Sequence, residues 1–254
     1  MRKIIYCLCL CLIVLACSGE DAQTQNDASS REEINYSLWD NVLKTYVNEQ
    51  GRVDYEGLLK DRHKFDQFIA QVEKVNISTF TPQEQKAFWI NAYNAITMKV
   101  IVDNYPVKGI RTINFGLVWN VGRNVAGGKK SLSDIEHKIL RLLGDPRIHF
   151  AINCASIGCP RLLNKPFYPE TLDEQLDREA VRFINDPEKI KLDRATNTLF
   201  YSAILDWFEE DFLVVESDIL SYIKRYINKE DRDYISSHEI MLKVTKYDWG
   251  LNKQ

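Results

Sequence analysis

The sequence predicts an α+β fold in which a helix-rich single domain packs on a small, mainly antiparallel sheet. Two observations lead to this prediction. Most apolar residues recur at helical spacing, and the few strand-like runs do not alternate regularly with the helices, as they would in a doubly wound sheet. A chain of 254 residues without an internal repeat also suits one domain with a sizeable core.

The first half of the domain is expected to be helical. Apolar residues at helical spacing predict helices at Tyr36–Val47 and Asp61–Val75, the first of them followed by Gly51. Thr81 and Pro82 form a strong helix start, and the helix that follows should run to about Asp103 in the core.

The second half mixes helices and short strands. The Ser133–Glu136 segment has the pattern of a capping box, which would open a helix that ends at Gly144. The apolar run Ile148–Asn153 is expected to be a strand, and the turn Ala195–Asn197 indicates a hairpin. The other predicted elements are strands at Leu117–Asn120 and Ile240–Tyr247 and helices at Thr171–Ile184, Ile204–Phe212 and Glu216–Tyr226.

The N-terminus predicts secretion and lipid anchoring. Residues 1–16 combine a positive start with an apolar run too short to span a bilayer, as in a signal peptide. The run ends at Ala16-Cys17, which resembles a bacterial lipobox, so Cys17 is the expected lipidation site. Residues 17–31 are then a disordered polar tether, and residues 32–254 the globular domain. The expected location is the bacterial cell envelope, on the outer membrane, either facing the periplasm or exposed at the surface.

Composition narrows the range of partners. Removal of the signal peptide takes the formal charge from −3 to −5, and no basic run appears, so nucleic acid is not expected as a partner. There is no CxxC pair, HExxH motif or phosphate-binding glycine loop, and therefore neither a metal nor a cofactor is predicted. The expected partners are the membrane, through the lipid, and an unknown peptide, glycan or protein ligand.

Several segments resemble one family of uncharacterised proteins. The segments are Ala87–Ala95, Leu132–Arg141, His149–Cys154 with Cys159-Pro160, Asp206–Phe212 and Tyr247–Asn252. Together they resemble, in order and across the whole domain, the signatures of the DUF547 family. The resemblance implies a fold related to the papain-like or transglutaminase-like cysteine hydrolases, and this relation is an analogy at the level of the fold.

Cys154 is the best candidate for a nucleophile. It ends the apolar run and begins a loop rich in Gly and Pro, where a thiolate would be exposed and backbone N–H groups would face a developing oxyanion. The alternative is a Cys154–Cys159 disulfide, since the two cysteines lie close in sequence and the expected compartment is oxidising.

Two histidines compete for the role of base. His137 is the preferred candidate, with Glu136 to orient it, although neighbouring helical residues do not face each other and Glu136 also fits the capping acid of its own helix. His149 is the alternative base; in a regular strand it would face away from Cys154. Trp207, Phe208 and Phe212 are expected in the core rather than in a binding surface.

Two functions follow from these residues. One is a cysteine-dependent hydrolase or acyl-transfer enzyme of the cell envelope, with Cys154, His137 and Glu136 as catalytic residues. The other is a non-catalytic binding or interaction module with a structural Cys154–Cys159 disulfide. The sequence does not decide whether the protein is an enzyme.

Overall fold

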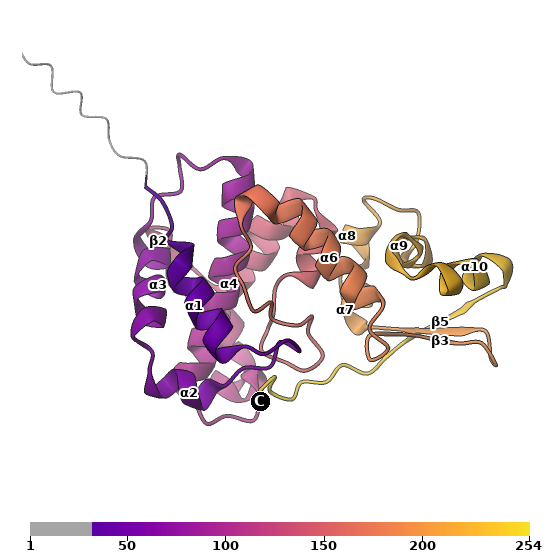
Figure 1. Cartoon of the computed structure of the whole chain (residues 1–254), viewed down its shortest axis with the longest axis horizontal. Coiled ribbons are helices and arrows are strands. Elements are labelled where there is room, and N and C mark those ends of the chain that lie inside the picture. Colours follow the sequence, from indigo (N-terminus) through magenta and orange to yellow (C-terminus); the bar gives the residue numbers. More distant parts are fainter. Residues whose placement is uncertain (1–31) are drawn as a thin grey trace, which may run out of the picture. The chain divides into compact units, whose positions relative to one another are not determined.

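The computed structural model describes residues 32–254. Helices α1 (Tyr36–Tyr46), α2 (Tyr55–Lys60) and α3 (His63–Lys74) surround the long helix α4 (Pro82–Asn104) at one end of the domain (Figure 1). Trp39 of α1 stacks on Phe65 and Phe68 of α3, which ties these two helices together. The predicted helices in this half are confirmed to within about two residues.

Helix α4 is the centre of the core. Thr81 and Glu84 form the expected capping box, with Pro82 in the first turn. Buried residues occupy every face of α4 from Ala87 to Met98, as is typical of a helix enclosed on all sides. The side-chain amides of Asn91 and Asn94, both buried on this helix, can therefore form hydrogen bonds only with other parts of the protein.

The other half contains the sheet. Strands β3 (Ile190–Asp193) and β4 (Thr198–Tyr201) form the predicted antiparallel hairpin, and β5 (Met241–Val244) adds to β4 in parallel. A second small hairpin pairs β1 (Arg123–Val125) with β2 (Gly128–Lys130). The α+β class is therefore confirmed. The remaining helices are α5 (Leu132–Ile135), α6 (Leu172–Ile184), α7 (Ala203–Trp207), α8 (Glu209–Phe212), α9 (Ile219–Tyr226) and α10 (Lys229–Ser237).

The strand predicted at Ile148–Asn153 is wrong. Residues Pro146–Phe150 form a 3-10 helix, because the Asp145 side chain accepts from the N–H of Arg147 and Pro146 occupies the first turn. A short apolar run buried on both sides has no periodicity that separates a strand from a helix. The strand predicted at Leu117–Asn120 is also wrong, since these residues end a 3-10 segment, Ile110–Asn120.

The capping box predicted at Ser133–Glu136 is displaced by two residues. The Ser131 hydroxyl caps α5 by accepting from the Asp134 N–H, and the Asp134 carboxylate accepts from the Ser131 N–H. Since β2 ends at Lys130, the helix starts at the first serine that is free of the hairpin. Glu136 is thereby released from a capping role. The chain continues as a π-helical turn, Glu136–Leu140, and a 3-10 turn before Gly144.

The predictions for the N-terminus lie outside the described residues. They comprise the signal peptide at 1–16, the lipidated Cys17 and the tether at 17–31. Among residues 32–254, no helix has the length and apolar character needed to cross a membrane.

Candidate functional site

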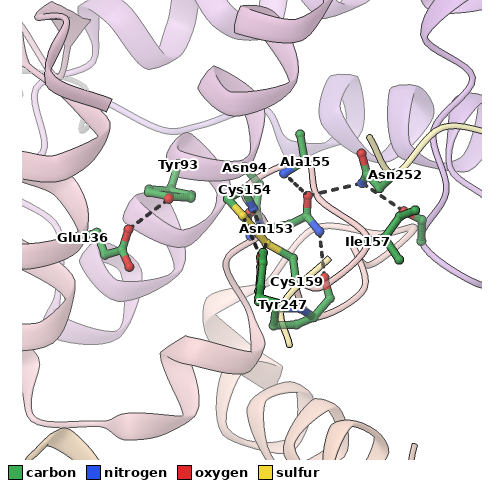
Figure 2. Close-up of a disulfide and its surroundings, with 12 residues drawn as sticks. Tyr93, Asn94, Glu136, Asn153, Cys154, Ala155, Ile157, Cys159, Tyr247 and Asn252 are labelled. Carbon is green, nitrogen blue, oxygen red and sulfur yellow. Dashed lines mark hydrogen bonds between the residues drawn. A yellow bond between two sulfur atoms is a disulfide. The ribbon is translucent and has the colours of Figure 1, made fainter. Parts of the chain in front are cut away.

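The loop after the Pro146–Phe150 helix carries a disulfide. Cys154 and Cys159 are bonded, with their Cα atoms 6.3 Å apart (Figure 2). Asn153 shapes the loop from within: its amide donates to the Pro160 carbonyl at 2.7 Å and accepts from the Ala155 N–H at 2.7 Å. These bonds support Ala155 in a left-handed conformation, with φ +61°.

Helix α4 and the C-terminal segment hold the loop in place. Asn94 of α4 donates to the Ala151 carbonyl at 2.9 Å and accepts from the Asn153 N–H at 2.8 Å. On the other side, Ile157 and Gly158 donate to carbonyls of Gly250 and Asp248. Two segments far apart in the sequence therefore set the position of the cysteines.

Tyr247 lies directly against the disulfide. Its hydroxyl is 3.1 Å from Cys154 Sγ and 2.9 Å from Cys159 Sγ. Burial, together with the negative charge of Glu136, raises the pKa of Tyr247, although a contact with Ser156 opposes this shift. The phenol therefore stays protonated and can donate a hydrogen bond at this position.

A cleft of about 260 Å³ opens beside the disulfide. It brings together the proposed nucleophile and both candidate histidines. Aromatic rings form much of its wall. The cleft is lined by Cys154, Cys159, Pro160, Glu136, His137, His149, Ile152, Ile204, Tyr93, Trp119, Trp207, Phe208, Tyr247 and Trp249.

His149 has the carboxylate partner that an oriented base requires. Its Nε2 lies 2.7 Å from Oδ2 of Asp211, and its ring stacks on Phe208 with centroids 4.1 Å apart. Burial alone would raise the pKa of Asp211, but hydrogen bonds from His149 and Arg141 lower it to about 2. The strand geometry that disfavoured His149 does not exist, because this segment is a 3-10 helix.

His137 and Glu136 do not contact each other in this way. The Nδ1 atom of His137 lies 3.2 Å from a guanidinium nitrogen of Arg141, and its side chain is exposed. The Glu136 carboxylate accepts from the Tyr93 hydroxyl at 3.0 Å (Figure 2). Both residues line the cleft, but the expected pairing of Glu136 with His137 is not among their hydrogen bonds.

The backbone of the disulfide loop is largely engaged. The N–H of Cys154 donates to Cys159 Sγ at 3.0 Å, and that of Cys159 donates to the Ser156 carbonyl. Those of Ala155, Ile157 and Gly158 have the partners described above. These five N–H groups already have acceptors and are not free to bind an oxyanion. The expectation that backbone N–H groups of this loop face a developing oxyanion therefore does not hold for them. Tyr247 supplies a donor at the sulfur atoms instead.

Comparison with known proteins identifies a family. Residues 77–184 match the family described as "Protein of unknown function, DUF547". These residues are a DUF547 domain. No curated protein and no solved structure matches the chain.

The DUF547 match covers only part of the cleft. Cys154, both histidines and Glu136 lie within residues 77–184, whereas Asp211 and Tyr247 lie after them. The sequence interpretation missed these two residues as site residues. Asp211 belongs to the Asp206–Phe212 segment and Tyr247 begins the Tyr247–Asn252 segment, and both segments carried the family resemblance. That family resemblance was the feature of the sequence that could have identified Asp211 and Tyr247 as site residues.

The aromatic residues expected in the core divide between two environments. Phe212 is buried, as predicted. Trp207 is 48% exposed and lines the cleft, so the core prediction is wrong for this residue. Phe208 is half-buried; it packs against the hydrophobic cluster that contains Phe212 and also lines the cleft. Trp207 stacks against Trp249, with centroids 5.8 Å apart, because the C-terminal segment passes beside α7. Among residues 32–254, no group of three or more His, Cys, Asp or Glu side chains is placed to hold a metal ion.

Proposed function

We propose that this DUF547 protein is a lipid-anchored enzyme of the bacterial cell envelope that carries out cysteine-dependent hydrolysis or acyl transfer. One observation carries the proposal: Cys154 shares a cleft with His149, and His149 is bonded to Asp211 at 2.7 Å. A nucleophile, a base and a residue that orients the base are the minimum set for this chemistry.

The oxidised pair must first be reduced. A dithiol reductant of the envelope supplies two electrons and two protons, so that Cys154 and Cys159 become thiols while the reductant becomes a disulfide. In the oxidised form the Cys154 N–H donates to Cys159 Sγ.

The reaction then proceeds through a thioester. His149 accepts the thiol proton on Nδ1, the nitrogen not bonded to Asp211, and the thiolate attacks the acyl carbonyl. Tyr247 donates to the oxyanion, since its hydroxyl lies beside Cys154 Sγ. The proton passes to the leaving group, and water or a second nucleophile releases the acyl group from Cys154.

Alkylation tests the nucleophile. The mature chain is treated with iodoacetamide with and without a phosphine reductant, and the modified residues are identified by mass spectrometry. We expect Cys154 to be labelled in the folded, reduced protein. The reduced protein is then assayed on a panel of ester and thioester substrates, and Cys154→Ser is expected to abolish turnover. Turnover that persists in Cys154→Ser, or a reduced Cys154 that stays unlabelled, would contradict the proposal.

The two histidines provide a matched comparison. In the reduced protein His149→Gln is expected to lower kcat by 100-fold or more, the usual contribution of a general base. His137→Gln, in the same cleft but without a carboxylate partner, is expected to stay within about threefold of the wild type. A larger loss of kcat in His137→Gln than in His149→Gln would indicate that His137 is the base.

The anchoring part of the proposal rests on the N-terminal sequence. We expect labelled palmitate to be incorporated into the chain in a bacterial host, and Cys17→Ala to release the protein into the soluble envelope fraction. Incorporation that survives Cys17→Ala would exclude Cys17 as the lipidated residue.

A second function is favoured by the closed disulfide. In a non-catalytic module the bridge would be structural, and the aromatic wall would bind a peptide, glycan or protein partner by stacking. This function predicts that the oxidised chain binds its partner as well as the reduced chain does and turns over no acyl substrate in either state.

A further inference from the structure

A second cavity lies next to the disulfide loop, and the side chains that line it differ from those of the cleft. Its volume is about 400 Å³, and it shares Cys159 and Pro160 with the cleft but contains none of its histidines or aromatic rings. Four segments form its walls: the turn between α1 and α2, the disulfide loop, the end of α6 with the turn that follows it, and the C-terminal segment at Asn252. A cavity of this size accommodates a small molecule.

Positively charged side chains predominate in this cavity. Four cations line it, namely Arg52, Arg161, Arg182 and Lys189, together with the carboxylates Asp186 and Glu188. Arg161 is already neutralised, because both its Nε and a terminal nitrogen donate to the buried Glu179 at 2.7 Å.

The other three cations lack such a partner. Within residues 32–254, no carboxylate lies within 4.0 Å of the charged nitrogens of Arg52, Arg182 or Lys189. Arg182 donates weakly to the Glu49 carbonyl at 3.3 Å, and Lys189 Nζ donates to the Ile157 carbonyl at 2.7 Å. The cavity therefore keeps an excess of positive charge over its two carboxylates.

Lys189 is the cation that would gain most from an anion. Burial lowers the pKa of this lysine, and the nearby Asp186 and Glu188 oppose that shift only from a distance. A partly desolvated ammonium bonded to a neutral carbonyl is stabilised when an anion reaches it. Two guanidinium groups in the same cavity add donors suited to the oxygens of a carboxylate or phosphate.

From this arrangement we infer that the cavity is a binding site for a small molecule bearing an oxyanion group, a carboxylate or a phosphate. Lys189, Arg52 and Arg182 are the residues that hold the group. The site differs from the acyl-transfer cleft in its lining, and binding of the anion there requires no turnover.

Calorimetric titration of the oxidised protein tests the inference. Inorganic phosphate and malonate are the two probes, each titrated at constant ionic strength set with sodium chloride. We expect saturable binding of at least one probe, and the preferred probe identifies the source of the anion as a phosphate or a carboxylate. Lys189→Met is expected to raise the dissociation constant of that probe at least tenfold.

Two further variants distinguish binding in this cavity from a general effect of changing a surface charge. Arg182→Glu changes an exposed residue of α6, and it should weaken binding to a similar degree. Lys74→Gln removes an exposed lysine of α3 that does not line the cavity, and it should leave binding unchanged. The inference is overturned if neither probe binds saturably, if Arg182→Glu binds as the wild type does, or if Lys74→Gln weakens binding equally.

Discussion

At the scale of single residues, Asp211 holds His149, which lines the cleft, and Arg141 together. One carboxylate accepts from His149 and from Arg141, and all three side chains are at least four-fifths buried. Removal of this carboxylate leaves the buried His149 imidazole without its acceptor, whereas Arg141 keeps its ion pair with Glu210. The same contacts fix which nitrogen of His149 faces Asp211.

We expect Asp211→Asn to lower the free energy of unfolding by about 2 kcal/mol at pH 7, the scale of a charged hydrogen bond. The folded-state pKa of Asp211 is about 2, against an ordinary value of 3.8. The unfolded chain therefore takes up the proton first, so this stabilisation is complete above about pH 4 and is lost as the pH falls towards 2. Urea unfolding between pH 2 and pH 7 measures both effects.

A surface ion pair provides the control for this prediction. Asp233 pairs with Lys229 one turn away on α10, where both side chains are mostly exposed. Asp233→Asn should change stability by less than about 0.5 kcal/mol. An Asp211→Asn protein that keeps the full acid-dependent loss of the wild type would show that Asp211 is not its source.

At the scale of elements, close packing between loops positions the disulfide. Gly51, in the turn between α1 and α2, contacts the chain shortly after Cys159. A Cβ atom on Gly51 would lie 2.6 Å from both Cβ of Arg161 and the backbone N of Leu162. Gly51 also has φ +75°, a conformation that other residues rarely adopt. Both the close approach and the positive φ thus require glycine at position 51.

Gly51→Ala is expected to lower the free energy of unfolding by about 3 kcal/mol, from the clash and the backbone strain together. Gly127→Ala is a matched control: Gly127 has φ +69° but no atom within 4 Å of the added Cβ, so strain alone should cost about 1 kcal/mol. Thermal or urea unfolding measures the difference. Equal losses in the two variants would show that the Arg161 contact relaxes without cost.

At the scale of the whole domain, two hydrophobic clusters meet beside the site. The larger contains α4 and the helices around it, and the smaller contains residues of α6, α9 and the sheet. The Pro146–Phe150 helix contributes to both, since Ile148 belongs to the first cluster and Phe150 to the second. The helix that precedes Cys154 therefore depends on both clusters.

Phe150→Ala is expected to lower the free energy of unfolding by about 4 kcal/mol, because Phe150 is buried against Phe183, Phe212 and Tyr222. Phe115→Ala removes the same ring from a side chain that is 99% exposed, and it should change stability by less than about 0.5 kcal/mol. Urea unfolding followed by circular dichroism compares the two. A small loss in Phe150→Ala would mean that the second cluster repacks around the gap.

Local patterns in the sequence were sufficient for most helices, the β3–β4 hairpin and the family. Periodicity, caps and turn residues act over a few positions, so they are visible in the chain itself. Where two local solutions were equally good, the tertiary structure decided. Ser131 rather than Ser133 capped α5 because the preceding hairpin ends there. The apolar run before Cys154 is enclosed by both clusters, and it forms a 3-10 helix that begins at the Asp145 cap.

The sequence by itself placed the cysteine loop and both candidate histidines within one stretch, residues 77–184, that matches the DUF547 family. Only the tertiary structure decided how they are arranged. The contact between His149 and Asp211 joins residues 62 positions apart, and that between Cys154 and Tyr247 joins residues 93 positions apart. Contacts at such separations arise from the packing of whole elements, and no local periodicity records them.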